Sequence, residues 1–296
     1  MFINGKSEYD AFGFSVSLSA DGNTIAIGAP GTFLGLIGTG YASIYKNVEG
    51  NWSQIGQNII GESIFDNNGC SVSLSADGTM VAIGAIGGSN ENGRVRIYKN
   101  TAETWSQIGL DIKGNPLEGY FTQSVCLSAD GNILAVGAAS ESFYGDRPGH
   151  VRIYKYSLGT WTQLGADIAG EAAGDQCGYS ISLSGMGSVV AIGAPFNSGN
   201  GAYSGHSRVY DLSDLLASDS FGLAHFSIYP NPVSEIVNIS LQDNLILEKV
   251  NIYNALGQLV TSEKQNTINV NTLSKGTYFV EVITSEGKAT KTIVVE

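Results

Sequence analysis

Polar and apolar residues alternate in one short segment that the chain contains four times. It reads SVSLSADG at 15–22 and at 71–78, SVCLSADG at 124–131 and SISLSGMG at 180–187, and the starts lie 56, 53 and 56 residues apart. Because successive side chains of a strand point to opposite faces, this period of two predicts a strand with Val and Leu on one face and hydroxyls on the other. The repetition predicts units that bury apolar faces against their neighbours.

The rest of each repeat predicts a small antiparallel sheet. In the first copy Asp21-Gly22 is a tight-hairpin signal, because Gly tolerates a positive φ and Asp can bond its own backbone. Strands are then expected at 25–28, 42–45 and 52–55, with a longer connection to the next copy. Four strands with this connection are the wiring of a β-propeller blade. The serine-containing strand is expected innermost, where its small residues fit a crowded channel wall.

Several motifs in this frame resemble FG-GAP repeats, the propeller repeats of integrin α-subunit heads. They are Phe12-Gly13 before the first strand, Gly28-Ala29-Pro30 and Gly193-Ala194-Pro195 after the second, and the third strand from Gly149 to Tyr154. The resemblance covers about residues 3–211. It implies an all-β, propeller-type domain over 1–211, in which the last repeat lacks its fourth strand; the repeats span about 3–56, 57–109, 110–165 and 166–211.

The hairpin turns depart from the family in one respect. Many FG-GAP repeats carry a D-x-D-x-D-G calcium loop here, whereas this chain keeps only Asp21, Asp77 and Asp130, each followed by Gly, and the fourth copy reads Gly-Met-Gly. One carboxylate cannot supply the six to eight oxygens that calcium takes. We therefore interpret the three Asp residues as hairpin formers, with calcium as the weaker alternative, and we expect no cofactor.

Other residues recur at fixed places in the repeat. We expect Trp52, Trp105 and Trp161 to pack between blades, and Asp10, Asp66 and Asp175 to cap the linkers before the first strands. Tyr41, Arg94, His150 and His206 share one strand-end position, where a surface location is expected for the histidines. After Tyr210 the fourth copy is expected to continue as a short helical turn or linker over 212–225.

A different pattern begins after this linker. Tyr229-Pro230-Asn231-Pro232 is a stiff segment, because two prolines fix φ and remove donors. Short strands separated by turn residues follow, which suggests a small β-sandwich of the Ig-like kind over 226–296. The strands are expected at Ile236–Leu241, Lys249–Tyr253, Gln258–Thr261, Thr267–Val270, Thr277–Thr284 and Ala289–Val295.

This C-terminal segment resembles the sorting domain of the type IX secretion system of Bacteroidetes. The resemblance rests on Tyr229, Pro230, Asn231 and Pro232, on Gly257 and Gly276 with Tyr278, and on the closing Lys291–Val295; the final Glu296 stands where members more often end in Lys or Arg. It implies handling by the secretion machinery, export across the outer membrane, removal of the domain, and release or attachment at the cell surface.

Composition excludes several classes of partner and chemistry. The net charge is −12 and no long apolar run is present, so nucleic acid, anionic membranes and membrane insertion are not expected. Cys70, Cys126 and Cys177 have no CxxC spacing, which argues against a disulfide framework or zinc site, although a Cys70–Cys126 bridge is left open. No G-x-S-x-G, HExxH or P-loop motif occurs, and we expect no enzyme.

Two functions remain open from the sequence. The first is a secreted adhesion or binding protein that contacts a protein or glycan through the loops at 30–40, 86–93, 139–149 and 195–205. The second is the C-terminal accessory part of a larger secreted hydrolase. The segment 1–10 has no signal-peptide pattern, and no Trp strand precedes the first copy, so we expect a C-terminal portion of a longer propeller protein. A complete four-blade ring is the alternative; the ligand, anchoring and oligomeric state stay undetermined.

Overall fold

The structure, a computed structural model, describes residues 2–31, 38–87, 93–114, 121–139, 148–217, 226–241, 245–284 and 287–296, with the backbone alone at 287 and 288. The chain divides into two compact units, Met1–Leu216 and Ala217–Glu296. Both are built almost entirely of strands, as the alternating patterns predict.

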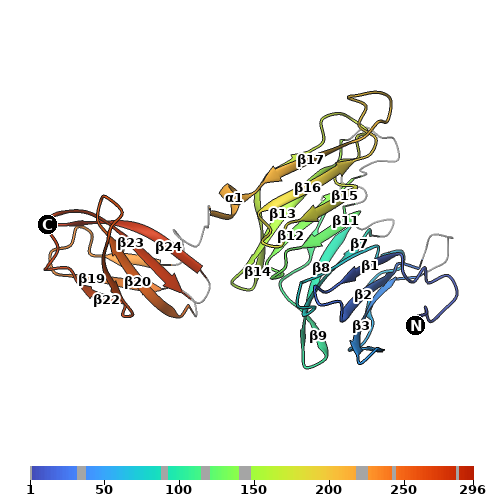
Figure 1. Cartoon of the computed structure of the whole chain (residues 1–296), viewed down its shortest axis with the longest axis horizontal. Helices are drawn as coiled ribbons and strands as arrows, with labels where there is room; N and C mark the ends of the chain where they lie inside the picture. The colour runs from blue at the N-terminus through green and yellow to red at the C-terminus, as the bar shows by residue number, and fades with distance from the viewer. Residues whose placement is uncertain are drawn as a thin grey trace. The chain divides into compact units, whose positions relative to one another are not determined.

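The first unit consists of four antiparallel sheets, one for each repeat, that follow one another in chain order (Figure 1). The strands that contain the alternating Ser residues lie at one edge of their sheets, and each contacts the same strand of the next sheet. The first two sheets contain β1 (Ser15–Leu18), β2 (Thr24–Ala29), β3 (Tyr41–Val48), β4 (Asn51–Gln54) and β5 (Ile59–Ile60), then β6 (Ser71–Leu74), β7 (Met80–Ala85), β8 (Arg94–Thr101), β9 (Thr104–Gln107) and β10 (Ile112–Lys113).

The third and fourth sheets repeat this order with changes at the outer edge. The third contains β11 (Ser124–Leu127), β12 (Ile133–Ala138), β13 (His150–Ser157) and a long β14 (Thr160–Ala169), which runs through the region that β5 and β10 occupy in the first two sheets. The fourth contains β15 (Ser180–Leu183), β16 (Val189–Ala194) and β17 (His206–Asp211), followed by the helix α1 (Ser213–Ala217). Within the described residues the fourth sheet has three strands and is followed by a short helical turn, as predicted. The pairing of the linker segments β5 and β10 with the third strand of their sheets is not predicted by the sequence.

Three apolar clusters fill the three spaces between neighbouring sheets. In the first of them Ala26 and Ile44 of the first sheet meet Val72, Leu74 and Ile83 of the second, all of them buried. Burying a side chain of this size contributes about 1.5–3 kcal/mol. The core therefore lies between repeats rather than within any one of them, as the repetition predicts.

The serine hydroxyls of the edge strands β1 and β6 form hydrogen bonds with the next sheet. The Ser17 hydroxyl accepts a hydrogen bond from the Leu74 amide at 2.9 Å, and the Ser73 hydroxyl accepts one from the Leu127 amide at 2.9 Å. Cys126 takes this role in the third sheet, where its thiol accepts from the Leu183 amide at 3.3 Å. The small residues thus do not simply line a channel wall, as expected above, because their polar atoms face the neighbouring sheet.

Trp105 and Trp161 pack between sheets, as predicted, whereas Trp52 lies in β4 of the first sheet, which has no preceding sheet among the described residues. Trp105 lies against Gly56 of the preceding sheet and donates from its indole N–H to the Ile55 carbonyl at 3.1 Å. Trp161 lies against Gly109 at the equivalent place, but within the described residues its buried indole N–H has no acceptor. In the fourth sheet Leu215 of α1 lies against Gly165, at the place where a Trp strand would be. The helix therefore caps the last inter-sheet space.

The second unit is a two-layer sandwich with one core. One layer pairs β18 (Phe226–Tyr229), β19 (Ile236–Leu241) and β22 (Thr267–Asn269). The other layer has the order β21-β20-β23-β24, formed by β21 (Leu259–Glu263), β20 (Leu247–Tyr253), β23 (Gly276–Thr284) and β24 (Gly287–Val295). The six predicted strands are present, and β18 is an additional one.

We expect Ser73→Ala to lower the free energy of unfolding of the first unit by about 1–3 kcal/mol, because the buried Leu127 amide loses its acceptor. Urea denaturation followed by tryptophan fluorescence measures this change, since all three tryptophans lie in this unit. The control is Ser106→Ala on the exposed side of β9, which should change stability by less than about 0.5 kcal/mol. Equal effects of the two substitutions would contradict the role given to Ser73.

Candidate functional sites

The residues of the C-terminal motif gather at one end of the second unit. Strand pairing places Val295 beside Gly276 and Phe279 beside Tyr253, so the turn that contains Gly257 lies at the same end of the sheet as the start of β23 and the end of β24. Val233, directly after the Tyr-Pro-Asn-Pro segment, bridges to Val295 at this end. Segments up to about 60 residues apart in the sequence therefore form one surface.

Asn231 ties the proline segment to the last strand. Its side-chain N–H donates to the Thr292 carbonyl at 3.0 Å, and its side-chain oxygen accepts from the Val294 amide at 2.9 Å. An amide side chain offers a donor and an acceptor together, which is the combination that an exposed strand edge can satisfy. The Asn between the two prolines thus docks the segment Tyr229–Pro232 along β24.

Gly257 and Tyr278, two other residues of the motif, shape the backbone and the core at this end. Gly257 has φ 75° in the turn between β20 and β21, where a Cβ would be strained. Tyr278 is buried and donates its hydroxyl hydrogen bond to the Ser274 carbonyl at 2.9 Å. Leu259, Phe279 and Val294 are exposed on the β21-β20-β23-β24 layer, and Tyr229 is exposed on β18 of the other layer.

In the first unit the three hairpin carboxylates are occupied by their own turns. Asp21 accepts from the Ser19 hydroxyl at 2.6 Å and from the Asn23 amide at 2.9 Å, and Asp77 and Asp130 repeat this arrangement. The Ser19 hydrogen bond, followed by those from Asn23, lowers the pKa of Asp21. The interpretation of these residues as hairpin formers is confirmed. No group of three or more metal-binding side chains occurs in the part of the chain that the structure describes.

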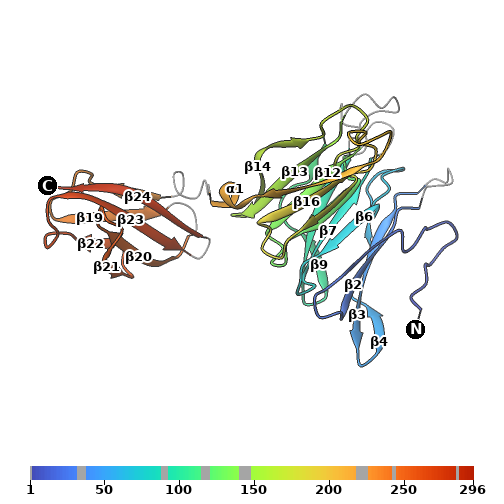
Figure 2. The ribbon, with the colours of Figure 1, turned by 45° about the horizontal axis from the view of Figure 1, so that its top comes forward.

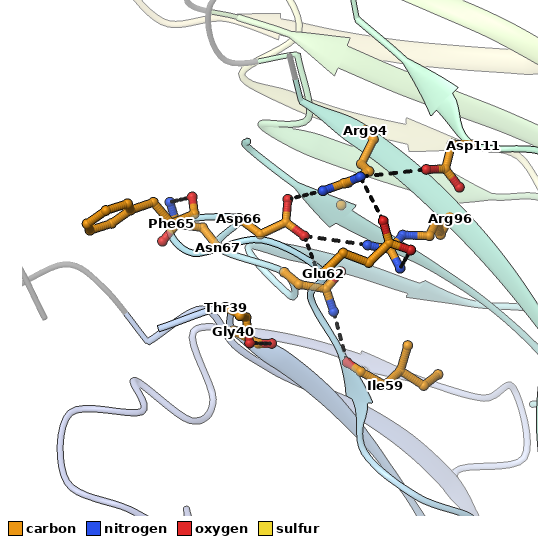
Figure 3. A network of polar contacts seen from close by, with 12 residues as sticks. Thr39, Gly40, Ile59, Glu62, Phe65, Asp66, Asn67, Arg94, Arg96 and Asp111 are labelled. Carbon is orange, nitrogen blue, oxygen red and sulfur yellow. Dashed lines mark hydrogen bonds and ion pairs between the residues drawn. The ribbon is translucent and has the colours of Figure 1, made fainter. Parts of the chain in front are cut away.

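The linker carboxylates cap their linkers, as predicted, and one of them also forms a buried ion-pair network (Figure 3). Asp66 is fully buried, accepts from the Glu62 amide at 3.0 Å, and lies 2.8 Å from Arg94 and 3.4 Å from Arg96. Glu62 bridges the same two guanidinium groups at 3.1 Å from each. Both arginines are buried, so the network joins the linker to β8 without contact with solvent at Asp66.

The equivalent strand-end position differs in the other sheets. Tyr41 donates to Asp10 at 2.7 Å, whereas His150 lies 3.7 Å from Asp167 and His206 lies 3.7 Å from Glu171. The expectation of a surface location is wrong for His150, which is buried between its strand neighbours Ala138 of β12 and Ala169 of β14. His225 lies outside the described residues.

The cysteines are free thiols, so the Cys70–Cys126 bridge is not formed. Burial raises the pKa of Cys70 to about 11, although hydrogen bonds with Thr122 and Ser71 oppose the shift. Cys126 takes part in the contact between the third and fourth sheets, as described above.

Of the four predicted binding loops, the connection at 195–205 is described in full, while 32–37, 88–92 and 140–147 of the other three lie outside the described residues. Together with the linker 171–176, this connection lines a surface groove of about 990 Å³. Phe196 and Tyr203 are 42% and 73% exposed beside it, and their rings meet edge to face at 6.0 Å. The groove therefore offers aromatic surface to solvent.

Asp175 fixes the floor of this groove. Its carboxylate accepts from the Asn197 side chain at 2.8 Å and from the Ala172 amide at 2.9 Å, and the Asn197 oxygen accepts from the Gly199 amide at 2.9 Å. Burial would raise the pKa of Asp175, but the hydrogen bonds from Asn197 and from the Ala172 and Glu171 amides outweigh burial and lower it. The stabilisation is present above the ordinary pKa of an Asp and is lost as the pH falls through the lowered value.

Residues 227–296 match the family described as the secretion system C-terminal sorting domain. The second unit is therefore a sorting domain, and the protein is exported to the cell surface or the medium. No helix in the described ranges is both long and apolar enough to cross a membrane.

One curated relative is an ulvan lyase, NLR42, of Nonlabens ulvanivorans. It is 36% identical over 85 residues, which is 27% of this chain and 16% of the lyase. The match thus spans about a sixth of that protein's length, and it does not define the activity of the present chain.

Solved structures with a similar arrangement are distant. They include the hydrazine synthase of Kuenenia stuttgartiensis (12% identity, TM-score 0.46, 100% of this chain and 70% of that one), a TolB of Agrobacterium tumefaciens (11%, 0.41, 94% and 79%) and a prolyl endopeptidase (10%, 0.40, 95% and 42%). At these scores the likenesses carry no information about the activity of this chain.

We expect Asp66→Asn to lower the free energy of unfolding by about 3 kcal/mol, because a buried charge facing two buried arginines is removed. Glu62→Gln is the matched control, since the Glu62 side chain is 60% exposed and its ion pairs are screened. Thermal and urea unfolding of both variants measure the difference. A larger loss in the Glu62 variant would contradict the central place of Asp66.

Proposed function

We propose that this is an exported binding protein without catalytic activity of its own. In this proposal the four repeat sheets are blades of an FG-GAP-type β-propeller, and their loops bind a protein or glycan outside the cell. The observation that carries the proposal is a sorting domain joined to a repeated scaffold that presents an aromatic groove at one of its loops. The Ig-like assignment of the sandwich belongs to the same proposal.

The groove supports ligand binding more than catalysis. Aromatic rings beside hydrogen-bonding groups suit a sugar ring or a peptide side chain. The carboxylate in its floor, Asp175, is buried and already accepts three hydrogen bonds, so it is not placed to transfer protons to a ligand. Function by loops on a rigid scaffold is common, and analogy with adhesion heads is at the level of the fold.

The second candidate is an accessory role beside a secreted hydrolase. It is favoured by the partial similarity to an ulvan lyase. In this case the chain would bind the glycan that a catalytic domain acts on. Ulvan binding without ulvan cleavage by the purified chain would support this role, and cleavage would contradict the non-catalytic proposal.

We expect the double substitution Phe196→Ala and Tyr203→Ala to weaken binding of the protein or glycan that the wild-type chain captures on arrays of both kinds. Loss of two aromatic contacts should reduce affinity at least tenfold, equivalent to about 1.4 kcal/mol. Phe65→Ala in the linker of the second repeat is the control, because this ring is also exposed but lies outside the groove. Failure of the wild-type chain to bind any array would contradict the proposal.

We expect Asn231→Ala to reduce the exported fraction several-fold in a host with a type IX system, because the proline segment loses both hydrogen bonds to β24. The exposed Asn271 supplies the control variant, Asn271→Ala. Immunoblots of medium, surface and periplasm measure export, and circular dichroism of the purified chains separates export from folding. Normal export of a folded Asn231 variant would show that docking of this segment is not needed for sorting.

A further inference from the structure

The three contacts between neighbouring sheets repeat the same three hydrogen bonds. At the first contact, the Ser15 hydroxyl donates to the Gly69 carbonyl at 2.8 Å, the Ser17 hydroxyl accepts from the Leu74 amide at 2.9 Å, and the Ala20 amide donates to the Ala76 carbonyl at 2.8 Å. The second and third contacts have the same bonds at the equivalent positions. Each sheet thus has a serine face toward the next sheet and a valine–leucine face toward the preceding one.

Each of these two faces is exposed to solvent at one end of the series of sheets. In β1 the Ser residues are partly buried while Val16 and Leu18 are 61% and 56% exposed, although the equivalent Val72 and Leu74 are 7% exposed. In β15 the pattern is reversed, with Ser180 and Ser182 exposed. Among the described residues of the first unit, the first sheet therefore has no neighbour on its valine–leucine face, and the fourth has none on its serine face.

The serine face of the fourth sheet keeps its binding groups. Ser180 and Ser182 occupy the positions of Ser15 and Ser17, and within the described residues neither hydroxyl has a hydrogen-bond partner. Val209 is 69% exposed on this face, whereas Ile44, Ile97 and Ile153 at the same position are 0%, 0% and 2% exposed. The exposed valine–leucine face of the first sheet and the exposed serine face of the fourth are therefore complementary. They are the same two surfaces that meet at each of the three contacts within the chain.

We propose that a second copy of this chain pairs head to tail, with its first sheet against the fourth sheet of its partner. The repeat register fixes the expected bonds: the Ser180 hydroxyl to the Gly13 carbonyl, the Ser182 hydroxyl to the Leu18 amide, and the Gly185 amide to the Ala20 carbonyl. Val16 and Leu18 then pack beside Val209. The bonds match the internal contacts one for one.

A second copy is the occupant that these faces fit, because it carries both halves in the right register. One such contact leaves a valine–leucine face exposed on one copy and a serine face exposed on the other. Two copies therefore form a closed ring only when they make the contact twice. The product is a ring of eight sheets, within the range of about four to eight blades that propellers have. Closure also covers the exposed side chains on the faces of both end sheets.

The mass of the full chain in solution tests the pairing. We expect light scattering after size-exclusion chromatography at micromolar concentrations to give twice the mass of one chain. Leu18→Asp and Val209→Asp should each give the single-chain mass, since every contact contains one copy of each residue. Leu110→Asp is the control, because Leu110 is 83% exposed in the second linker, and it should keep the double mass.

Mixing the two variants distinguishes head-to-tail pairing from other modes. The Leu18 variant has an intact fourth sheet and the Val209 variant an intact first sheet, so an equal mixture should regain a species of double mass. In a second measurement, Leu18→Cys in one copy and Ser182→Cys in the other should form a disulfide between chains on oxidation. A wild-type chain of single mass, or a mixture that stays at single mass and forms no such disulfide, would overturn the proposal.

Discussion

The alternating strand at the inner edge of each sheet is the element on which the first unit depends. One face of this strand buries Val and Leu against the preceding sheet, and the other face uses a hydroxyl to hold an amide of the next. A four-residue strand has too few ladder bonds and too little area to be stable alone. Because the same strand contacts two neighbours, each sheet shares its buried apolar residues with the sheets beside it, which follow one another in Figure 2.

This dependence explains which parts of the repeat are constant. Ser73 can be replaced in the third copy by Cys126, since a thiol of similar size can still accept a hydrogen bond from the next amide. The outer edge varies more freely: two Trp strands and one short helix reach the same kind of Gly position on the preceding sheet. Different elements can therefore fill the space beside the Gly at the outer edge. At the other edge, Ser or Cys accepts the hydrogen bond from the amide of the next sheet.

The sequence predicts the strands and their partners well because period-two alternation and Asp-Gly turns are local signals. It predicts poorly whatever depends on contacts between distant residues. The pairing of β5 and β10, the burial of His150 and the amide contacts of Ser17 all require the neighbouring sheet or linker to be in place. Similarly, the prolines around Asn231 are visible as a stiff segment, but its docking on β24 involves residues about 60 positions away.

The candidate functional residues of the two units lie on different kinds of structure. In the sorting domain the motif residues lie at the end of a continuous sheet, so their geometry is set by strand register and by the buried Tyr278. In the repeat unit the described groove lies in a connection between strands, and its floor is fixed by Asp175 and Asn197 rather than by sheet pairing. A loop held by a buried carboxylate can change its outer side chains without disturbing the stacked sheets. In the proposed binding function, the outer side chains of this loop are therefore separate from the residues that hold the fold and from the sorting domain.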